Sequence, residues 1–266
     1  MSHVSDIASV NGISIAYSDS GGGGPVVVLS HGYLMDSSMF DLQVAALTPE
    51  YRVITWDQRG FGATKATEPF SYWDSAKDLF ALLDHLGIDQ AILGGMSQGG
   101  FVSLRAALLA PERVRALILI DSQAGLEDPA AVPAYEQIEL VWEQQGPEPV
   151  RDLVAAIILG PANGPVDYAP WFAKWDAVDV ERATFAFRCL LDRDDITGRL
   201  GEISCPTLIL HGTADAAIAM ERAEAVQAGI GGVATLVQIE GGSHAANLSN
   251  PDEVNAAMVE FLSSLP

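Results

Sequence analysis

The residue best suited to chemistry in this chain is Ser97, which lies in the pattern Gly-x-Ser-x-Gly over residues 95–99. An apolar run precedes it and a helical pattern follows it, so the sequence predicts a strand, a sharp turn that carries Ser97, and a helix. Gly95 and Gly99 fit this turn because a side chain two residues from the serine would collide across it. The turn exposes the hydroxyl, which predicts a nucleophile at Ser97.

Two later segments carry the side chains that a serine nucleophile needs. Asp215 follows the apolar run at 206–210, and His244 follows another at 234–239. We expect His244 to accept the serine proton, and Asp215 to hold the other imidazole nitrogen and stabilise the imidazolium. Asp121, which ends the predicted strand at 115–120, is the alternative acid, but an irregular segment follows it.

These residues all follow predicted strands. The alternation around the turn signal Asn11-Gly12 predicts two antiparallel edge strands, and apolar runs at 26–30, 51–56, 91–96, 115–120, 206–211 and 234–239 predict six more. Helical patterns stand between most of these runs, which implies right-handed crossovers and a mostly parallel sheet. Because active groups collect at the carboxyl ends of parallel strands, we expect Ser97, Asp215 and His244 to meet at one edge.

The alternation of strands and helices stops after residue 121. Residues 132–143, 149–159, 170–175 and 180–191 show helical patterns that are separated by Pro and Gly. We therefore expect a core domain formed by residues 1–123 and 200–266, and a helical cap domain at residues 124–199, called the insertion below. It should cover Ser97 and decide which substrates fit.

Side chains of the insertion supply the candidates for substrate binding. Its many aromatic residues favour a largely apolar pocket, with Trp142, Trp171 and Trp175 as the predicted substrate-binding residues. Exposed arginines usually bind no ligand, but four arginines here are candidates to receive a substrate carboxylate: Arg182, Arg188, Arg193 and Arg199.

Composition excludes several classes of partner. The chain has 14 Lys and Arg against 35 Asp and Glu, and its net charge of −21 argues against nucleic acid and anionic membranes. Nowhere is an apolar run long enough to span a bilayer, so we expect a cytoplasmic protein. Cys189 and Cys205 fit no disulfide framework or metal spacing, and we expect neither metal nor cofactor. The sequence leaves the oligomeric state open.

Four further residues at strand ends look structural. His31 and His211 each precede a glycine, where a hydrogen bond that holds the loop is the favoured interpretation. Asp57 and Arg59 lie in a tight loop punctuated by glycines, and we expect them to pair with each other and brace it.

Taken together, the motifs resemble the α/β-hydrolase superfamily, in its branch of esterases, lactonases and cofactor-free haloperoxidases. The resemblance spans essentially the whole chain and is carried by residues 31–32, 57–62, 95–100, 211–215 and 242–244. It implies a mostly parallel eight-stranded sheet flanked by helices, with a helical cap inserted after the sixth strand. It also favours Asp215 as the acid, and implies an oxyanion hole formed by the backbone N–H groups of Tyr33 and Gln98.

The expected function is a serine hydrolase that cleaves a carboxylic ester or lactone through an acyl-enzyme on Ser97, without a cofactor. Its substrate is then a small, largely apolar molecule. One alternative keeps the same three residues and uses hydrogen peroxide as the acyl acceptor, as in a perhydrolase or cofactor-free haloperoxidase. An alternative of a different class is a ligand-binding or receptor-like protein with this fold and little turnover.

Overall fold

The computed structural model describes residues 6–48, 50–178 and 180–266, apart from the side chains of residues 180–182. Eight strands form one sheet in the order β1-β2-β4-β3-β5-β6-β7-β8. β2 pairs antiparallel with β1 and β4, and the other neighbours pair in parallel. The mostly parallel eight-stranded sheet with antiparallel edge strands is confirmed. The strands are β1 Asp6–Val10, β2 Ile13–Asp19, β3 Val26–Ser30, β4 Arg52–Trp56, β5 Ala91–Met96, β6 Val114–Ile120, β7 Thr207–Gly212 and β8 Ala234–Ile239.

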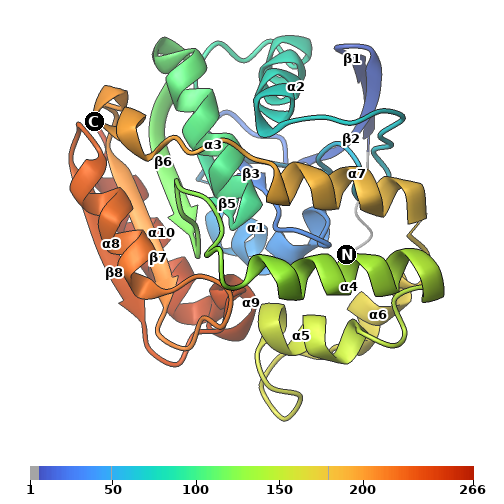
Figure 1. Ribbon diagram of the computed structural model, residues 1–266. Coiled ribbons are helices and arrows are strands. Elements are labelled where there is room, and N and C mark those ends of the chain that lie inside the picture. The colour runs from blue at the N-terminus through green and yellow to red at the C-terminus, as the bar shows by residue number, and fades with distance from the viewer. Residues whose placement is uncertain (1–5, 49, 179) are drawn as a thin grey trace.

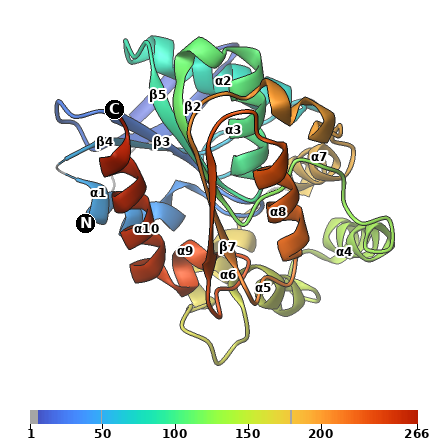
Figure 2. The ribbon, with the colours of Figure 1, turned by 90° about the vertical axis from the view of Figure 1, so that its left-hand side faces the viewer.

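Helices cover both faces of the sheet (Figure 2). α1 and α10 lie on one face, and α2, α3 and α8 lie on the other. The central strands β3, β5 and β6 are buried almost throughout, as their apolar sequences predict for strands covered on two sides. The bounds are α1 Asp41–Leu47, α2 Tyr72–His85, α3 Gln98–Leu109, α8 Met220–Gly229, α9 Ala246–Ser249 and α10 Pro251–Ser264, with short 3-10 helices at Ser37–Phe40, Pro111–Arg113 and Thr197–Glu202.

Four helices stand between β6 and β7, at the positions expected from the sequence. They are α4 Val132–Gln145, α5 Arg151–Leu159, α6 Ala169–Trp175 and α7 Val180–Leu191. Figure 1 shows them grouped together beside the sheet. Trp142 and Trp175 pack against each other, with ring centroids 6.4 Å apart, and Phe172 lies 5.7 Å from Trp175. These aromatic rings join a buried hydrophobic cluster that also contains residues of β3, β6 and β7.

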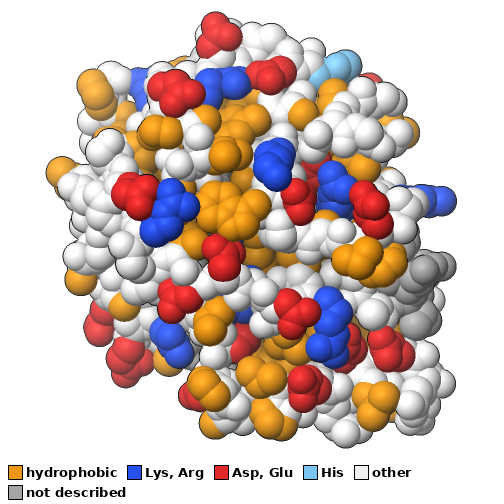
Figure 3. All heavy atoms as spheres, turned by 45° about the horizontal axis from the view of Figure 1, so that its top comes forward, with side chains coloured by type: hydrophobic (Ala, Val, Ile, Leu, Met, Phe, Trp, Pro, Cys, Tyr) orange, Lys and Arg blue, Asp and Glu red, His pale blue; other side chains and the backbone are white. Residues whose placement is uncertain are grey.

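The described surface is charged and mixed. Acidic and basic side chains are scattered between hydrophobic ones over the face in Figure 3, where the described residues form no continuous basic patch. None of the helices that the structure describes is long and apolar enough to cross a membrane.

Candidate active site

Ser97 occupies a strained turn between β5 and α3. Its backbone has φ 50° and ψ −114°, a combination that residues with a side chain rarely adopt. Ser97 N donates to Ile120 O at 2.8 Å, which ties the turn to β6. A Cβ on Gly95 would lie 2.1 Å from the backbone of Gly99, and one on Gly99 would lie 1.9 Å from Ser30 O. Glycine is therefore required at both positions, as expected.

Three side chains from separate strand ends form a continuous hydrogen-bonded chain. Ser97 Oγ lies 3.0 Å from His244 Nε2, and His244 Nδ1 lies 2.9 Å from Asp215 Oδ2. Because a carboxylate only accepts, Nδ1 carries the proton and the unprotonated Nε2 accepts from the hydroxyl. The other oxygen of Asp215 accepts from Ala217 N at 2.8 Å and Ile218 N at 2.9 Å, which fixes the carboxylate. This is the geometry of an activated serine.

The electrostatics of this chain favour a basic imidazole. Burial on its own lowers the pKa of His244, but the charge of Asp215 and their hydrogen bond outweigh it and raise the pKa above its usual value. Burial likewise would raise the pKa of Asp215, and the opposing effects of His244 and two backbone donors hold the pKa below its usual range. Asp215 therefore stays ionised while His244 takes a proton.

Asp121, the alternative acid, braces the loops instead. It is fully buried, and it accepts from Gly212 N at 2.7 Å and from Ala246 N at 3.0 Å. Gly212 ends β7 just before Asp215, and Ala246 begins α9 just after His244, so both amides flank the loops that carry these two residues. Burial, followed by the charge of Asp215, raises the pKa of Asp121 well above its usual value. The structure thus places Asp215, and not Asp121, on the imidazole.

Two backbone amides beside Ser97 are available for an oxyanion. Gln98 begins α3, so its N–H has no carbonyl one turn earlier. Tyr33 lies in the turn after β3, where Met35 N donates to Gly32 O at 3.1 Å. Within the described part of the chain, no hydrogen bond occupies the N–H of Tyr33 or Gln98. Tyr33 lines a cavity with Ser97, consistent with the predicted oxyanion hole.

The two other histidines at strand ends, His31 and His211, have structural partners. His31 Nε2 accepts from Gln58 N at 2.9 Å, so Nδ1 carries the proton and donates to Gly32 O at 2.8 Å. His211 Nε2 donates to Ile218 O at 2.8 Å. His211, Asp121 and Asp215 place one ligand atom each within 4.8 Å of one another. No such cluster was expected, but the hydrogen bonds above already use both carboxylates.

The expected pair between Asp57 and Arg59 is absent from the described residues. Asp57 accepts from Ser37 N at 2.9 Å and Ala63 N at 2.8 Å. Arg59 instead reaches α2, where Nη2 lies 2.9 Å from the fully buried Asp78. The prediction was wrong because neighbours in a tight loop point to different partners, which local spacing does not reveal.

A cavity of about 70 Å³ lies above Ser97. We call it the active-site cavity. Ser97, His244 and the loop after β3 line its core side, and the helices of the insertion line the other side with seven largely apolar side chains: Tyr135, Ile138, Val154, Ile157, Ile158, Phe187 and Leu190. Helices of the insertion therefore form one wall of the cavity that Ser97 lines, and this wall is largely apolar.

The three tryptophans predicted to bind substrate do not line this cavity. Trp142, Trp171 and Trp175 are 3%, 7% and 0% exposed and belong to the buried cluster that the insertion shares with the sheet. Trp175 Nε1 donates to Leu34 O at 2.7 Å, next to Tyr33. The prediction is corrected because these side chains are buried in the core. From the sequence, a buried aromatic side chain could not be distinguished from one that lines the cavity.

The arginines of the insertion are paired with acidic side chains. Arg188 bonds to Glu139 and Arg199 to Glu202, and Arg193 Nη2 lies 2.8 Å from Glu127 as an ion pair without hydrogen-bond geometry. Arg193 is buried, contrary to the expectation of exposed arginines. The side chain of Arg182 lies outside the described residues.

Glu127, which lines the active-site cavity, was not identified from the sequence. Nothing in its sequence context distinguished it from the other acidic residues.

Comparisons with known proteins agree with this geometry. Residues 25–157 match the family model described as alpha/beta hydrolase fold. A putative non-heme chloroperoxidase from Synechocystis is 30% identical over 94% of this chain and 95% of its own length. 3-Oxoadipate enol-lactonase 1 from Acinetobacter baylyi is 26% identical over 91% and 90% of the two chains. A thermophilic esterase from Thermogutta terrifontis is 28% identical, with a TM-score of 0.88 over 98% of both chains. The chain belongs to the α/β-hydrolase family.

Proposed function

We propose that this protein hydrolyses a carboxylic ester or lactone through an acyl-enzyme on Ser97. The observation that carries the proposal is the continuous chain of Ser97, His244 and Asp215, with contacts of 3.0 and 2.9 Å, at the floor of an apolar cavity. Two relatives described above are named as an esterase and an enol-lactonase, which supports the same reaction class.

The first half of the reaction transfers the acyl group to the enzyme. His244 Nε2 removes the Ser97 proton as Oγ attacks the substrate carbonyl, and the tetrahedral oxyanion accepts from Tyr33 N and Gln98 N. Asp215 stabilises the imidazolium that forms. His244 then donates its proton to the leaving oxygen, and the carbon–oxygen bond breaks. With a lactone, the alcohol formed stays attached to the acyl group.

The second half repeats these steps with water. His244 removes a proton from water, whose oxygen attacks the acyl carbon, and the same two amides hold the second oxyanion. Collapse of this intermediate returns the proton to Ser97 Oγ and releases the carboxylic acid. Each cycle consumes one water molecule, whose hydroxyl ends on the acyl group and whose proton balances the proton given to the leaving oxygen. The proposed cycle uses no cofactor.

We also propose that residues 124–199 act as a cap domain on the core formed by residues 1–123 and 200–266. Side chains from α4, α5 and α7 make up the wall opposite Ser97, so a substrate acyl group would touch both parts. The insertion is then the part of the chain that decides which acyl groups reach the hydroxyl.

A second candidate uses the same acyl-enzyme with hydrogen peroxide as acceptor. The relative named as a chloroperoxidase, at 30% identity, favours it. Peroxide attack on the acyl group would release a peracid instead of a carboxylic acid. Comparing peracid and acid formation from one acyl donor, with and without peroxide, separates the two reactions.

Ser97→Ala tests the shared chemistry. We expect hydrolysis of p-nitrophenyl butyrate to fall at least about 10⁴-fold, because the nucleophile is lost while the fold is kept. Ser103→Ala is the matched control, since Ser103 is also buried in α3 but donates to Gly99 O at 2.8 Å. Retained turnover in Ser97→Ala would refute the acyl-enzyme. Tight ligand binding with negligible turnover by the native protein would favour the receptor-like alternative.

A further inference from the structure

The active-site cavity contains one carboxylate that the proposed reaction does not use. Glu127 follows β6 and lines the cavity together with Ser97 and His244. Among the described residues, it is the only Asp, Glu, Lys or Arg in the lining. Its side chain is only 10% exposed, so its charge lies in a largely apolar space where water screens it weakly.

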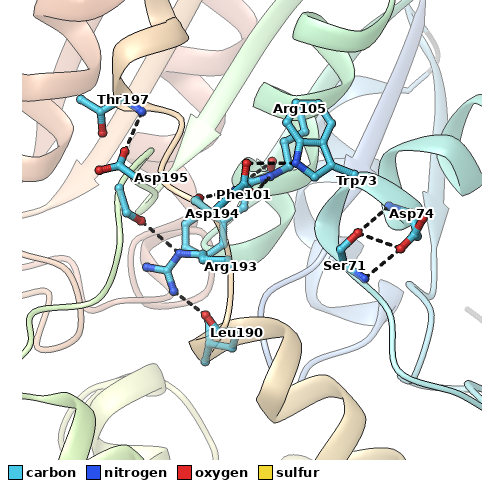
Figure 4. A network of polar contacts seen from close by, with 11 residues as sticks. Ser71, Trp73, Asp74, Phe101, Arg105, Leu190, Arg193, Asp194, Asp195 and Thr197 are labelled. Carbon is cyan, nitrogen blue, oxygen red and sulfur yellow. Dashed lines mark hydrogen bonds and ion pairs between the residues drawn. The ribbon is translucent and has the colours of Figure 1, made fainter.

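A buried arginine, Arg193, forms an ion pair with Glu127. Arg193 Nη2 lies 2.8 Å from Glu127 Oε1, and the side chain of Arg193 is 2% exposed. Arg193 also donates to Gly125 O at 3.0 Å and Leu190 O at 2.6 Å, and its guanidinium lies 4.6 Å from the ring centroid of Phe101 (Figure 4). The guanidinium is therefore anchored outside the lining, while the carboxylate is part of it.

The charge of Glu127 reaches other groups in the cavity. Burial mainly raises the pKa of Tyr135 to about 12, and the charge of Glu127 adds to it, with Arg193 opposing. Glu127 is also among the groups that oppose the effect of burial on the pKa of His244. The positive charge of Arg193 thus offsets Glu127 only in part on the cavity side.

We propose that Glu127 sets the charge preference of the active site. It selects against esters and lactones whose acyl group carries a carboxylate, and it favours acyl groups that are uncharged or carry an ammonium. The reason is that a second negative charge brought beside a buried carboxylate is repelled, whereas an ammonium is attracted. This inference rests on the proposed function, because the acyl group must occupy the active-site cavity.

Three esters of similar length and different charge test the preference. They are p-nitrophenyl pentanoate, the mono-p-nitrophenyl ester of adipic acid, and p-nitrophenyl 4-(trimethylammonio)butanoate, whose quaternary ammonium cannot attack its own ester. The measurement is kcat/KM for each ester with the native protein and with Glu127→Gln, at low and high salt. Ratios between esters cancel any general loss of active protein.

We expect the native protein to disfavour the carboxylate ester at least about tenfold against the neutral one. Glu127→Gln should raise the ratio of kcat/KM for the carboxylate ester to kcat/KM for the neutral ester about tenfold, and it should lower the corresponding ratio of ammonium to neutral ester. Both changes should be smaller at high salt, where charges are screened. Glu139→Gln is the matched control, because Glu139 also pairs with an arginine of the insertion but does not line the cavity. Its ratios should equal the native ones.

A double variant distinguishes the effect of losing the Glu127 carboxylate from the effect of leaving the Arg193 guanidinium unpaired. In Glu127→Gln with Arg193→Gln, no unpaired guanidinium remains, and the ratio of carboxylate to neutral ester should stay above the native value. Equal ratios in native and Glu127→Gln protein would overturn the inference, and so would a return to the native ratio in the double variant.

Failure of the proposed function would look different, since no ester would then be turned over. The charge preference is still measured in that case, by calorimetric binding of the same three esters to Ser97→Ala. Weaker binding of the carboxylate ester, relieved by adding Glu127→Gln, supports the inference. Equal binding of the three esters contradicts it.

Discussion

The two walls of the active-site cavity are built from different kinds of contact. On the core wall, directional hydrogen bonds between buried atoms hold the segments that carry Asp215 and His244, as when Asp121 accepts from Gly212 N and Ala246 N. On the wall formed by the insertion, apolar side chains such as Ile138 and Phe187 pack together, with exposed ion pairs outside them.

This difference separates the chemistry from the selection of substrate. Hydrogen bonds fix atoms within a narrow range of distance and angle, which proton transfer from Ser97 to His244 requires. Apolar contacts are not directional and tolerate substitutions of similar volume. The insertion can therefore change its side chains while the arrangement at the sheet edge stays intact.

The largest expected effect lies on the core wall. Asp215→Asn should reduce kcat about 10⁴-fold, because the amide favours the wrong tautomer of His244 and cannot stabilise the imidazolium. The base must be neutral to act, and Asp215 raises the pKa of His244. The acidic limb of the pH profile of kcat/KM should therefore lie above pH 6.5 in the native protein and move to lower pH in the variant. An unmoved limb with less than a tenfold loss would contradict this role.

The next largest effect is the loss of stability when a glycine beside Ser97 is replaced by alanine, compared with the same replacement in the insertion. Gly95→Ala should lower the free energy of unfolding by at least about 3 kcal/mol, because the new Cβ would lie 2.1 Å from the backbone of Gly99. Gly146 follows α4 with φ 78° and ψ −176°, a region that glycine alone adopts readily, and nothing lies within 4 Å of an added Cβ, so Gly146→Ala should cost less, about 1–3 kcal/mol. Urea denaturation measures both, and equal costs would remove the contrast between the two regions.

A smaller effect is expected where the insertion touches the core. Trp175→Phe removes the donor to Leu34 O, whose bond is 2.7 Å long, and should cost about 1–3 kcal/mol of stability. Trp142 is also buried in the insertion, but its Nε1 has no acceptor in the described part of the chain. Trp142→Phe should therefore cost less. Equal losses for the two variants in thermal unfolding would show that ring volume, and not the hydrogen bond, sets the cost.

Local patterns predicted most of the fold. The apolar runs of β3, β5 and β6 have the length and continuity of buried parallel strands, and the structure has strands there. Ser71 and Asp74 have the three-residue spacing of a capping box, and both of its hydrogen bonds are present at the start of α2. The edge that gathers Ser97, Asp215 and His244 followed from the alternation of strands and helices.

Contacts between distant segments were harder to predict. Arg59 and Asp78 are 19 residues apart, and Arg193 lies 66 positions after Glu127, so no spacing rule connects them. For Trp175, the sequence indicated a large apolar side chain but not which side of its helix faces the core. Such choices depend on how whole elements pack, and periodicity does not contain that information.

The backbone of Ser97 places a stability cost at the position that supplies reactivity. With φ 50° and ψ −114°, this residue holds a conformation that costs on the order of 1–3 kcal/mol for a residue with a Cβ. Glycine would adopt it with less strain. Selection for stability alone would therefore replace the proposed nucleophile, and under the proposed function the need for turnover would retain serine here. A lineage that had lost its substrate is expected to change at this position early.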